Sequence, residues 1–217
     1  MKELAVWGFS KVPPFAQGLV RDLRVRWALQ EAGLAYASRS IDPEKRQSDD
    51  YRRIHPFGMV PALESGDETL IESGAIVYAI AENCEALMPI DQRVATLTWM
   101  FTALNTVEPP LWNLFVMDEL HQGEEWTKLR RAGAVDEVKA RLAVLAEWLD
   151  DRAYLLGCFT AADILMTTVL RFIRHTRLLA DFPSLDAYVK RCEARPAFQN
   201  ALHEQLSGYA SNAPIAA

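Results

Sequence analysis

The chain has 217 residues, of which 50% are hydrophobic and 24% charged, so it can bury a core in one large domain or two smaller ones. Its net charge of −6 and its isoelectric point of about 5.3 argue against a surface that binds nucleic acid. No apolar run reaches the length of a transmembrane helix, and the N-terminus lacks the pattern of a signal peptide. We therefore expect a soluble, cytoplasmic protein that binds neither nucleic acid nor membrane.

The cysteines and histidines predict neither a disulfide framework nor a metal site. Cys84, Cys158 and Cys192 are odd in number and widely spaced. The four histidines are scattered and lack the spacing of zinc ligands. Reduced thiols fit a cytoplasmic protein.

The first part of the chain alternates short strands with helices. The sequence predicts strands at residues 4–7, 34–41, 60–63 and 69–71, helices at about 18–32 and 75–81, and a polar loop with a short helix at 42–53. Pro13-Pro14 should keep the first loop irregular, and Gly33 should end the first helix. This order of elements is that of an α/β thioredoxin-like domain, which we place at residues 1–83.

After a linker at residues 85–90, every segment is predicted to be helical. The expected helices span residues 93–120, 126–150, 161–175, 184–194 and 196–206. Pro109-Pro110 should end or kink the first of them. Thr160 can cap the apolar, central helix while Asp163 reaches back to the cap backbone. We expect residues 90–217 to form an all-helical C-terminal domain.

Basic residues are clustered along the first helix. Arg24 and Arg26 are expected on solvated helix faces. For Arg21 two interpretations are equally open: an anion site at the helix start, or a surface ion pair with Asp22 or Glu3.

The most informative stretch is HPFGMVPALESGDETLIESGAIVYAI, residues 55–80. A cis Val60-Pro61 bond would turn the backbone groups of Val60 toward a ligand. Ser73, at a helix start, can offer its hydroxyl and nearby N–H groups to a carboxylate, and Glu72 can receive an ammonium. These groups suit a ligand that resembles an amino acid, although a plain hairpin with a serine-capped helix is equally open.

The motifs HPFGMVPAL and ETLIESGAI resemble the glutathione-binding half of the cytosolic, bacterial-type glutathione S-transferases, with His55 where the family usually has Asn. Leu155-Leu156-Gly157 followed by Phe159-Thr160-Ala161-Ala162-Asp163 resembles the folding motif of their C-terminal domain. The resemblance covers nearly the whole chain. It implies the two-domain glutathione transferase fold and a homodimer.

The resemblance also implies which residues bind glutathione as a co-substrate. The expected ligands are Val60, Pro61, Glu72 and Ser73. Glu108 lies near the position from which an acidic residue of the partner subunit approaches the glutathione amine in dimeric relatives.

The residue that activates the thiol departs from the family pattern. Related enzymes use a Tyr, Ser or Cys near the start of the first helix, but the first loop has neither Tyr nor Cys. A gap-free count places Phe15 at the tyrosine position and Pro13 at the serine position, and neither side chain can donate a hydrogen bond. Ser10, as a hydroxyl donor, and Arg21, as a permanent charge, remain the catalytic candidates.

The implied activity is attack of the glutathione thiolate on a small hydrophobic electrophile, as in detoxification. Two alternatives stay open: a non-catalytic, transferase-like module for protein contacts, and a glutathione-dependent isomerase or dehalogenase. The absence of a loop cysteine argues against disulfide exchange. The sequence does not specify the electrophile, because pocket side chains vary freely on one fold.

Overall fold

The computed structural model describes residues 3–211. Contacts within the chain group into two compact units: residues 1–87 together with 195–217, and residues 88–194. The last helix therefore belongs to the first unit, although it is far from the rest of that unit in sequence. A division of the chain into two consecutive domains does not predict this association. The domain limits 1–83 and 90–217 stay a prediction.

The first unit contains a four-stranded mixed sheet in the order β2-β1-β3-β4. Its strands are β1 (Leu4–Phe9), β2 (Ala37–Ile41), β3 (Ala62–Ser65) and β4 (Glu68–Ile71). β1 runs parallel to β2 and antiparallel to β3, which forms a hairpin with β4. This topology confirms the predicted α/β N-terminal fold.

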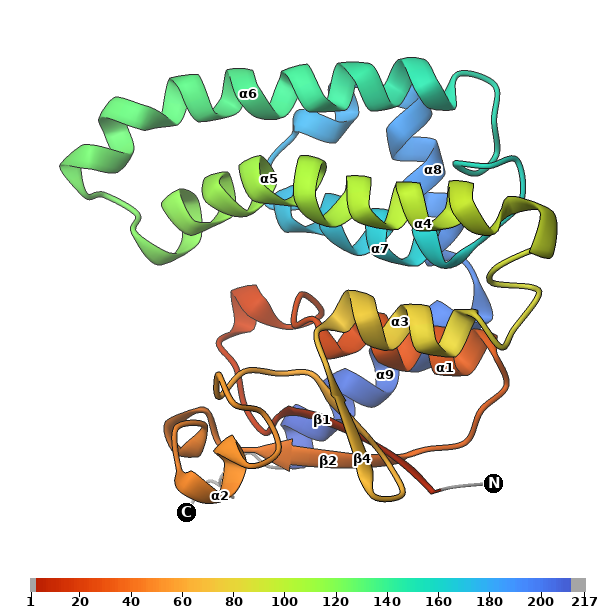
Figure 1. Cartoon of the computed structure of the whole chain (residues 1–217). Coiled ribbons are helices and arrows are strands. Elements are labelled where there is room, and N and C mark those ends of the chain that lie inside the picture. The colour runs from red at the N-terminus through yellow and green to blue at the C-terminus, as the bar shows by residue number, and fades with distance from the viewer. Residues whose placement is uncertain (1–2, 212–217) are drawn as a thin grey trace. The chain divides into compact units, whose positions relative to one another are not determined.

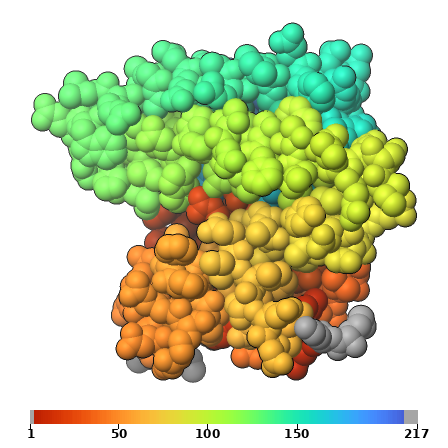
Figure 2. Space-filling model, in the orientation of Figure 1, coloured from red at the N-terminus to blue at the C-terminus, as the bar shows by residue number. Residues whose placement is uncertain are grey.

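Helices pack against this sheet and against one another. They are α1 (Asp22–Glu31), α2 (Asp49–Arg52), α3 (Ser73–Ala81) and α9 (Pro196–Ser211), with 3₁₀ turns at Pro14–Ala16 and Pro43–Lys45. α1 and α3 lie on the same face of the sheet, and α9 packs against α1 (Figure 1). Strand β1 is almost covered in the face that Figure 2 shows, in keeping with the burial of Ala5 and Val6.

The loop between β1 and α1 both begins and ends later in the chain than the sequence pattern predicts. β1 continues to Phe9 because its pairing with β2 runs to that residue, and α1 begins only at Asp22. Gly18 takes a positive φ of 74°, a conformation that interrupts a helix and that glycine adopts without strain. Gly33 ends α1 with a φ of 65°, as predicted.

The second unit is helical throughout its regular structure. Its elements are a 3₁₀ turn at Ile90–Gln92, α4 (Arg93–Phe101), a π-helix at Thr102–Val107, α5 (Glu108–Phe115), a second π-helix at Val116–Leu120, α6 (Glu125–Leu149), α7 (Ala161–Leu170), 3₁₀ turns at Arg171–Ile173 and Leu178–Asp181, and α8 (Pro183–Glu193). Every residue of α7 is buried, which confirms its predicted central place.

The double proline does not end the long helix. Pro109 and Pro110 stand in the first turn of α5, directly after the π-helix at Thr102–Val107, and the coil runs on from α4 into α5 (Figure 1). Proline has no N–H to offer to the carbonyl one turn earlier. The wider π turn accommodates the missing hydrogen bond, so helical structure continues where an end or a kink was expected.

Asp163 organises the start of α7. Its carboxylate accepts hydrogen bonds from the N–H groups of Thr160 (2.8 Å) and Leu155 (3.0 Å) and from the hydroxyl of Tyr188 (3.0 Å). The predicted capping box of Thr160 and Asp163 is confirmed. Burial raises the pKa of Asp163, and these donors oppose that rise because they favour the ionised form.

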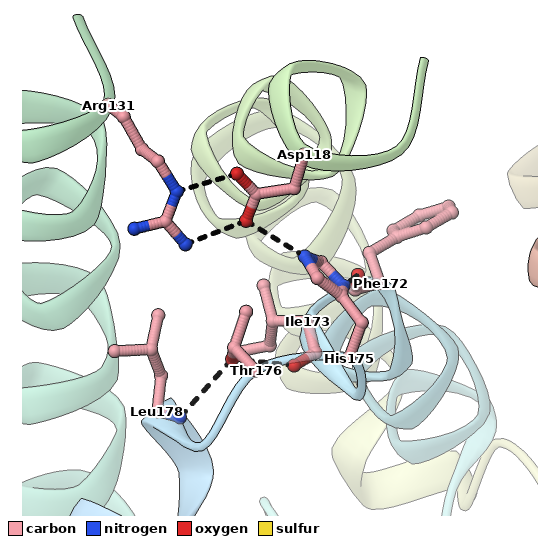
Figure 3. A network of polar contacts seen from close by, with 7 residues as sticks. All are labelled: Asp118, Arg131, Phe172, Ile173, His175, Thr176 and Leu178. Atoms are coloured by element: carbon pink, nitrogen blue, oxygen red, sulfur yellow. Dashed lines mark hydrogen bonds and ion pairs between the residues drawn. The ribbon is translucent and has the colours of Figure 1, made fainter. Parts of the chain in front are cut away.

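Asp118, in the π-helix at Val116–Leu120, links α6 to the turn that follows Arg171–Ile173 (Figure 3). Arg131, on α6, donates to both carboxylate oxygens at 2.7 and 2.9 Å, and Nε2 of His175 lies 3.0 Å from Oδ2. His175 Nδ1 faces the carbonyl of Phe172 at 3.1 Å. The cluster borders a cavity of about 410 Å³. Burial pushes the pKa of Asp118 up, but the bonds and charges of Arg131 and His175 outweigh it, so this pKa lies below its ordinary value.

Within residues 3–211, no helix is both long and apolar enough to cross a membrane.

Asp118→Asn should make the helical unit less sensitive to acid. The folded pKa of Asp118 is depressed, so the unfolded chain binds more protons below about pH 4, and the stabilisation from Asp118 is lost as the pH falls through the folded pKa. At neutral pH the substitution should cost about 0.5–1 kcal/mol, because the pair is partly exposed.

Urea unfolding between pH 3 and 7, followed by circular dichroism, measures this effect. The curves of the parent and Asp118→Asn should converge in acid. Asp136→Asn, which removes an exposed carboxylate from α6, should follow the parent. Parallel curves for parent and Asp118→Asn would contradict the assigned pairing.

Candidate functional site

Ser10 stands directly after β1, at the carboxyl end of two parallel strands. Its N–H donates to the carbonyl of Ile41, the last residue of β2, at 2.9 Å, and the residue is partly exposed. Ligands of open α/β sheets bind at the carboxyl ends of the strands. The structure therefore places Ser10 where a hydroxyl could reach a bound ligand.

Arg21 occupies the N-cap position of α1 and is partly exposed. The start of a helix carries a partial positive charge, which the guanidinium adds to. One interpretation paired Arg21 with Asp22 at the surface, but Asp22 is buried. It is 1% exposed and is bonded to Arg26 (2.8 Å) and Gln205 (2.6 Å). The position of Arg21 suits an anion.

The prediction that Arg24 and Arg26 lie on solvated helix faces is wrong. They are 2% and 5% exposed. Nη1 of Arg24 donates to the hydroxyl of Ser73 at 3.1 Å, across the packed pair α1 and α3. A guanidinium therefore lies at the start of α3, beside the hydroxyl that the sequence assigned to a carboxylate. Arg24 lies one helical turn before the apolar Ala28, which is buried. This spacing was the signal in the sequence that could have indicated the burial of Arg24.

The backbone at the start of β3 has the predicted conformation. The Val60-Pro61 peptide bond is cis, and Val60 is buried. The hydroxyl of Tyr51, on α2, donates to the carbonyl of Met59 at 2.8 Å and so fixes the chain just before Val60. The chain that leads into β3 is thus held by a side chain of α2.

Glu72 has a backbone conformation that is unusual for a residue with a side chain. Its φ is 65° and its ψ 114°, which costs roughly 1–3 kcal/mol and persists only where the surroundings impose it. Its carbonyl accepts from Ile76 N–H at 2.9 Å, and its side chain is exposed. This geometry presents the carboxylate of Glu72 while Ser73, which is only 5% exposed, begins α3.

His55 lies in the electrostatic field of Glu72. The residue is 2% exposed, and Nδ1 has no hydrogen-bond partner among the described residues. Burial lowers the pKa of His55, and the charge of Glu72 opposes that shift. A neutral imidazole therefore fits this position, where the resembled family usually has Asn.

The predicted residues fall into two groups. Ser10, Arg21, Val60-Pro61, Glu72 and Ser73 all belong to the first unit, near the starts of α1, β3 and α3. Glu108 belongs to the second unit, where it begins α5 and is 7% exposed. Its approach to a ligand in a partner subunit stays a prediction, and its burial leaves little of the side chain on the surface of its own chain.

The first group can bind an extended, charged molecule. The start of α3, with Ser73 and Arg24, can receive a carboxylate, and Glu72 can receive an ammonium. The backbone of Val60 can pair with a peptide group. Among the described residues, no cluster of three or more His, Cys, Asp or Glu side chains could hold a metal ion.

Comparisons with known proteins agree with both units. Residues 23–86 match the glutathione S-transferase N-terminal domain family, and residues 108–196 match the glutathione S-transferase C-terminal domain family. The chain is 31% identical over 188 residues to glutathione S-transferase GstA of Escherichia coli O157:H7, covering 80% of this chain and 89% of that protein. It is also 30% identical over 149 residues to elongation factor 1-gamma of Artemia salina, covering 66% of this chain and 34% of that protein.

A solved structure shares the same fold. It is a glutathione transferase from Burkholderia graminis with two glutathione molecules bound per protein subunit, with a TM-score of 0.81, 23% identity, and coverage of 93% of this chain and 88% of that one. With both family matches and the similarity to GstA, the chain belongs to the glutathione S-transferase family.

Proposed function

We propose that the protein binds glutathione and transfers it to a small hydrophobic electrophile, as a cytoplasmic detoxification enzyme. The observation that carries the proposal is the buried pair of Arg24 and Ser73 at the start of α3, next to the exposed carboxylate of Glu72. A buried guanidinium and a helix start favour a carboxylate. An ammonium one residue away would then contact Glu72.

Glutathione carries both of these groups on its γ-glutamyl end, followed by a peptide group and a thiol. The γ-glutamyl carboxylate would bind at Ser73 and its ammonium at Glu72. The next peptide group would pair with the backbone of Val60, beside the cis Pro61. This order directs the thiol toward the loop between β1 and α1, where Ser10 and Arg21 stand.

The transfer step requires the thiolate, whose formation from a free thiol is unfavourable at neutral pH. Arg21 and the start of α1 would favour the charged form, and the hydroxyl of Ser10 could donate a hydrogen bond to it. The thiolate sulfur then attacks the electrophilic atom, and the leaving group departs with the bonding electrons.

A second candidate function is a non-catalytic module for protein contacts. It is favoured by the first loop, which has no Tyr or Cys, and by the similarity to elongation factor 1-gamma. The two functions differ in one property: only the enzyme must lower the pKa of the bound thiol.

A homodimer is part of the proposal. Exposed apolar side chains lie on α4, where Val94 is 80% and Phe101 56% exposed, and on the hairpin–helix edge, at Leu70 and Tyr78. Exposed apolar side chains of this kind are the material from which interaction sites are built. We propose that the hairpin–helix edge of one subunit packs against the long helix of the other, where Glu108 begins α5.

Ser73→Ala should weaken glutathione binding roughly tenfold or more, since a charge-assisted hydrogen bond contributes about 1.5–3 kcal/mol. Calorimetric titration with glutathione measures the change. Ser40→Ala, which removes an exposed hydroxyl from β2, is the matched control and should bind like the parent. Equal affinities of parent and Ser73→Ala would show that the carboxylate binds elsewhere.

Arg21→Ala should raise the apparent pKa of the bound thiol, because it removes a positive charge that favours the thiolate. The ultraviolet thiolate band of bound glutathione, titrated with pH, reports this value. Ser10→Ala tests the hydroxyl, and Arg53→Ala removes an exposed charge of the same unit as a control. If neither Arg21→Ala nor Ser10→Ala moves the band, both assignments are wrong.

Sedimentation at micromolar concentration should give the mass of a dimer, about twice the 24.5 kDa of the chain. Phe101→Glu should shift the equilibrium to monomer, because a charge would be buried in the proposed contact. A monomeric parent protein would refute the dimer and with it any role of Glu108 toward a partner's ligand.

A further inference from the structure

Helix α9 is fastened to both ends of α1. At the C-terminal end of α1, Arg195 donates to the two carboxylate oxygens of Glu31 at 2.6 and 2.8 Å. In the middle, the rings of Trp27 and Phe198 meet with their centroids 4.9 Å apart. Toward the N-terminal end, the amide side chain of Gln205 makes a further contact.

Gln205 binds the two residues on either side of Arg21. Its Nε2 donates to the carbonyl of Val20 at 3.1 Å and to Oδ1 of Asp22 at 2.6 Å, and the residue is 2% exposed. Both partners are acceptors, so the NH₂ end of the amide must face them. Its Oε1 has no partner among the described residues. The amide therefore donates to the backbone carbonyl of the residue before Arg21 and to the side-chain carboxylate of the residue after it.

The carboxylate of Asp22 has further contacts besides Gln205, which hold it in place. Its Oδ2 accepts from Nε of Arg26 at 2.8 Å, and Nη1 of Arg26 lies 2.5 Å from the hydroxyl of Ser38 on β2. On the other side lies Gly8 of β1, where an added Cβ would be 2.7 Å from Asp22 Oδ2. The carboxylate is thus packed against β1 and bonded to Arg26 of α1, which is itself bonded to β2.

Val20 is the last loop residue before Arg21. Its carbonyl also accepts from the N–H of Leu23 at 3.1 Å, so both of its lone pairs are used. Gln205 connects this carbonyl to the fixed carboxylate of Asp22. The carbonyl before Arg21 and the side chain of the residue after it are thus held together by one side chain from the far end of the sequence.

We propose that Gln205 is a positioning residue for Arg21: its amide joins the carbonyl of Val20 to the buried carboxylate of Asp22, the residues on either side of Arg21, and so holds the guanidinium where it lowers the thiol pKa. The proposal rests on the proposed role of Arg21 in glutathione transfer. Gln205 acts through the loop and does not contact the ligand.

Gln205→Met is the direct test, since methionine keeps the length and apolar volume of the side chain and removes both donors. The apparent pKa of the bound thiol should rise by about half a unit or more, in the same direction as in Arg21→Ala. Glutathione affinity should stay within about twofold of the parent, because Val60, Glu72 and Ser73 are untouched. The amides of residues 18–22 should exchange hydrogen faster in the ligand-free protein.

Arg195→Met is the matched control, because it removes the α9 contact at the opposite end of α1. It should lower the thermal midpoint without moving the thiol pKa. The double variant Arg21→Ala with Gln205→Met should show no greater shift than Arg21→Ala alone, since a residue that acts through another adds nothing once that other is gone. An additive shift would overturn the proposal. If Gln205→Met fails to fold, Gln205→Asn keeps the amide but shortens its reach.

The outcomes separate this proposal from the proposed function. If Arg21→Ala raises the thiol pKa and Gln205→Met does not, the function stands and the positioning role is refuted. If the parent does not ionise bound glutathione at neutral pH, the proposed function is wrong, and the exchange measurement decides about Gln205. Unchanged exchange at residues 18–22 would then refute its hold on the loop.

Discussion

A carboxylate that is buried must be paired, and Asp22 is the buried carboxylate on which the first unit depends. Burial raises its pKa, and the bonds from Arg26 and Gln205 oppose that rise. Removing one partner of a buried ion pair typically costs about 3–5 kcal/mol. This one charge therefore requires Gly8 in β1, Arg26 in α1 and Gln205 in α9 at their places, and it fastens the sheet, the first helix and the last helix to one another.

The helical unit also contains a buried carboxylate that is paired by hydrogen bonds, that of Asp163. This carboxylate begins α7 and accepts from the backbone of Leu155 and Thr160 and from the hydroxyl of Tyr188 on α8. In both units a buried acid at the start of a helix satisfies donors that would otherwise lose their hydrogen bonds on burial. The acid also brings in a partner from a later helix, so each unit is closed by a long-range contact.

Binding and chemistry depend on different parts of the first unit. The groups proposed to hold glutathione stand on a cis-proline strand and a helix start, which packing fixes firmly. The groups proposed to ionise the thiol stand on a loop that the sheet holds at Ser10 and that α9 holds at Val20. A fold of this kind can keep its binding groups while its loop is altered, so fold alone does not decide between enzyme and binding module.

The sequence by itself determined the features that depend on neighbours in the chain. These were the order of strands and helices, the cis Val60-Pro61 bond, the glycine stop at Gly33 and the capping box of Thr160 and Asp163. Each follows from local backbone chemistry or from a motif of a few residues. Apart from Glu108, the candidate glutathione residues were found from motifs in one continuous stretch, through their resemblance to a known family.

Only the tertiary structure decided the features that depend on what packs against a residue. The sequence predicts Arg24 and Arg26 as surface charges, yet they are buried. Ser73 of α3, Ser38 of β2 and Glu204 of α9 lie around them, and Arg26 also pairs with Asp22 of their own helix. The double proline predicted an end or a kink, and the structure has a π-helix there that leads directly into α5. Gln205 gave no signal in the sequence, since its role arises from a contact that spans 185 residues of chain and exists only once α9 has packed on α1.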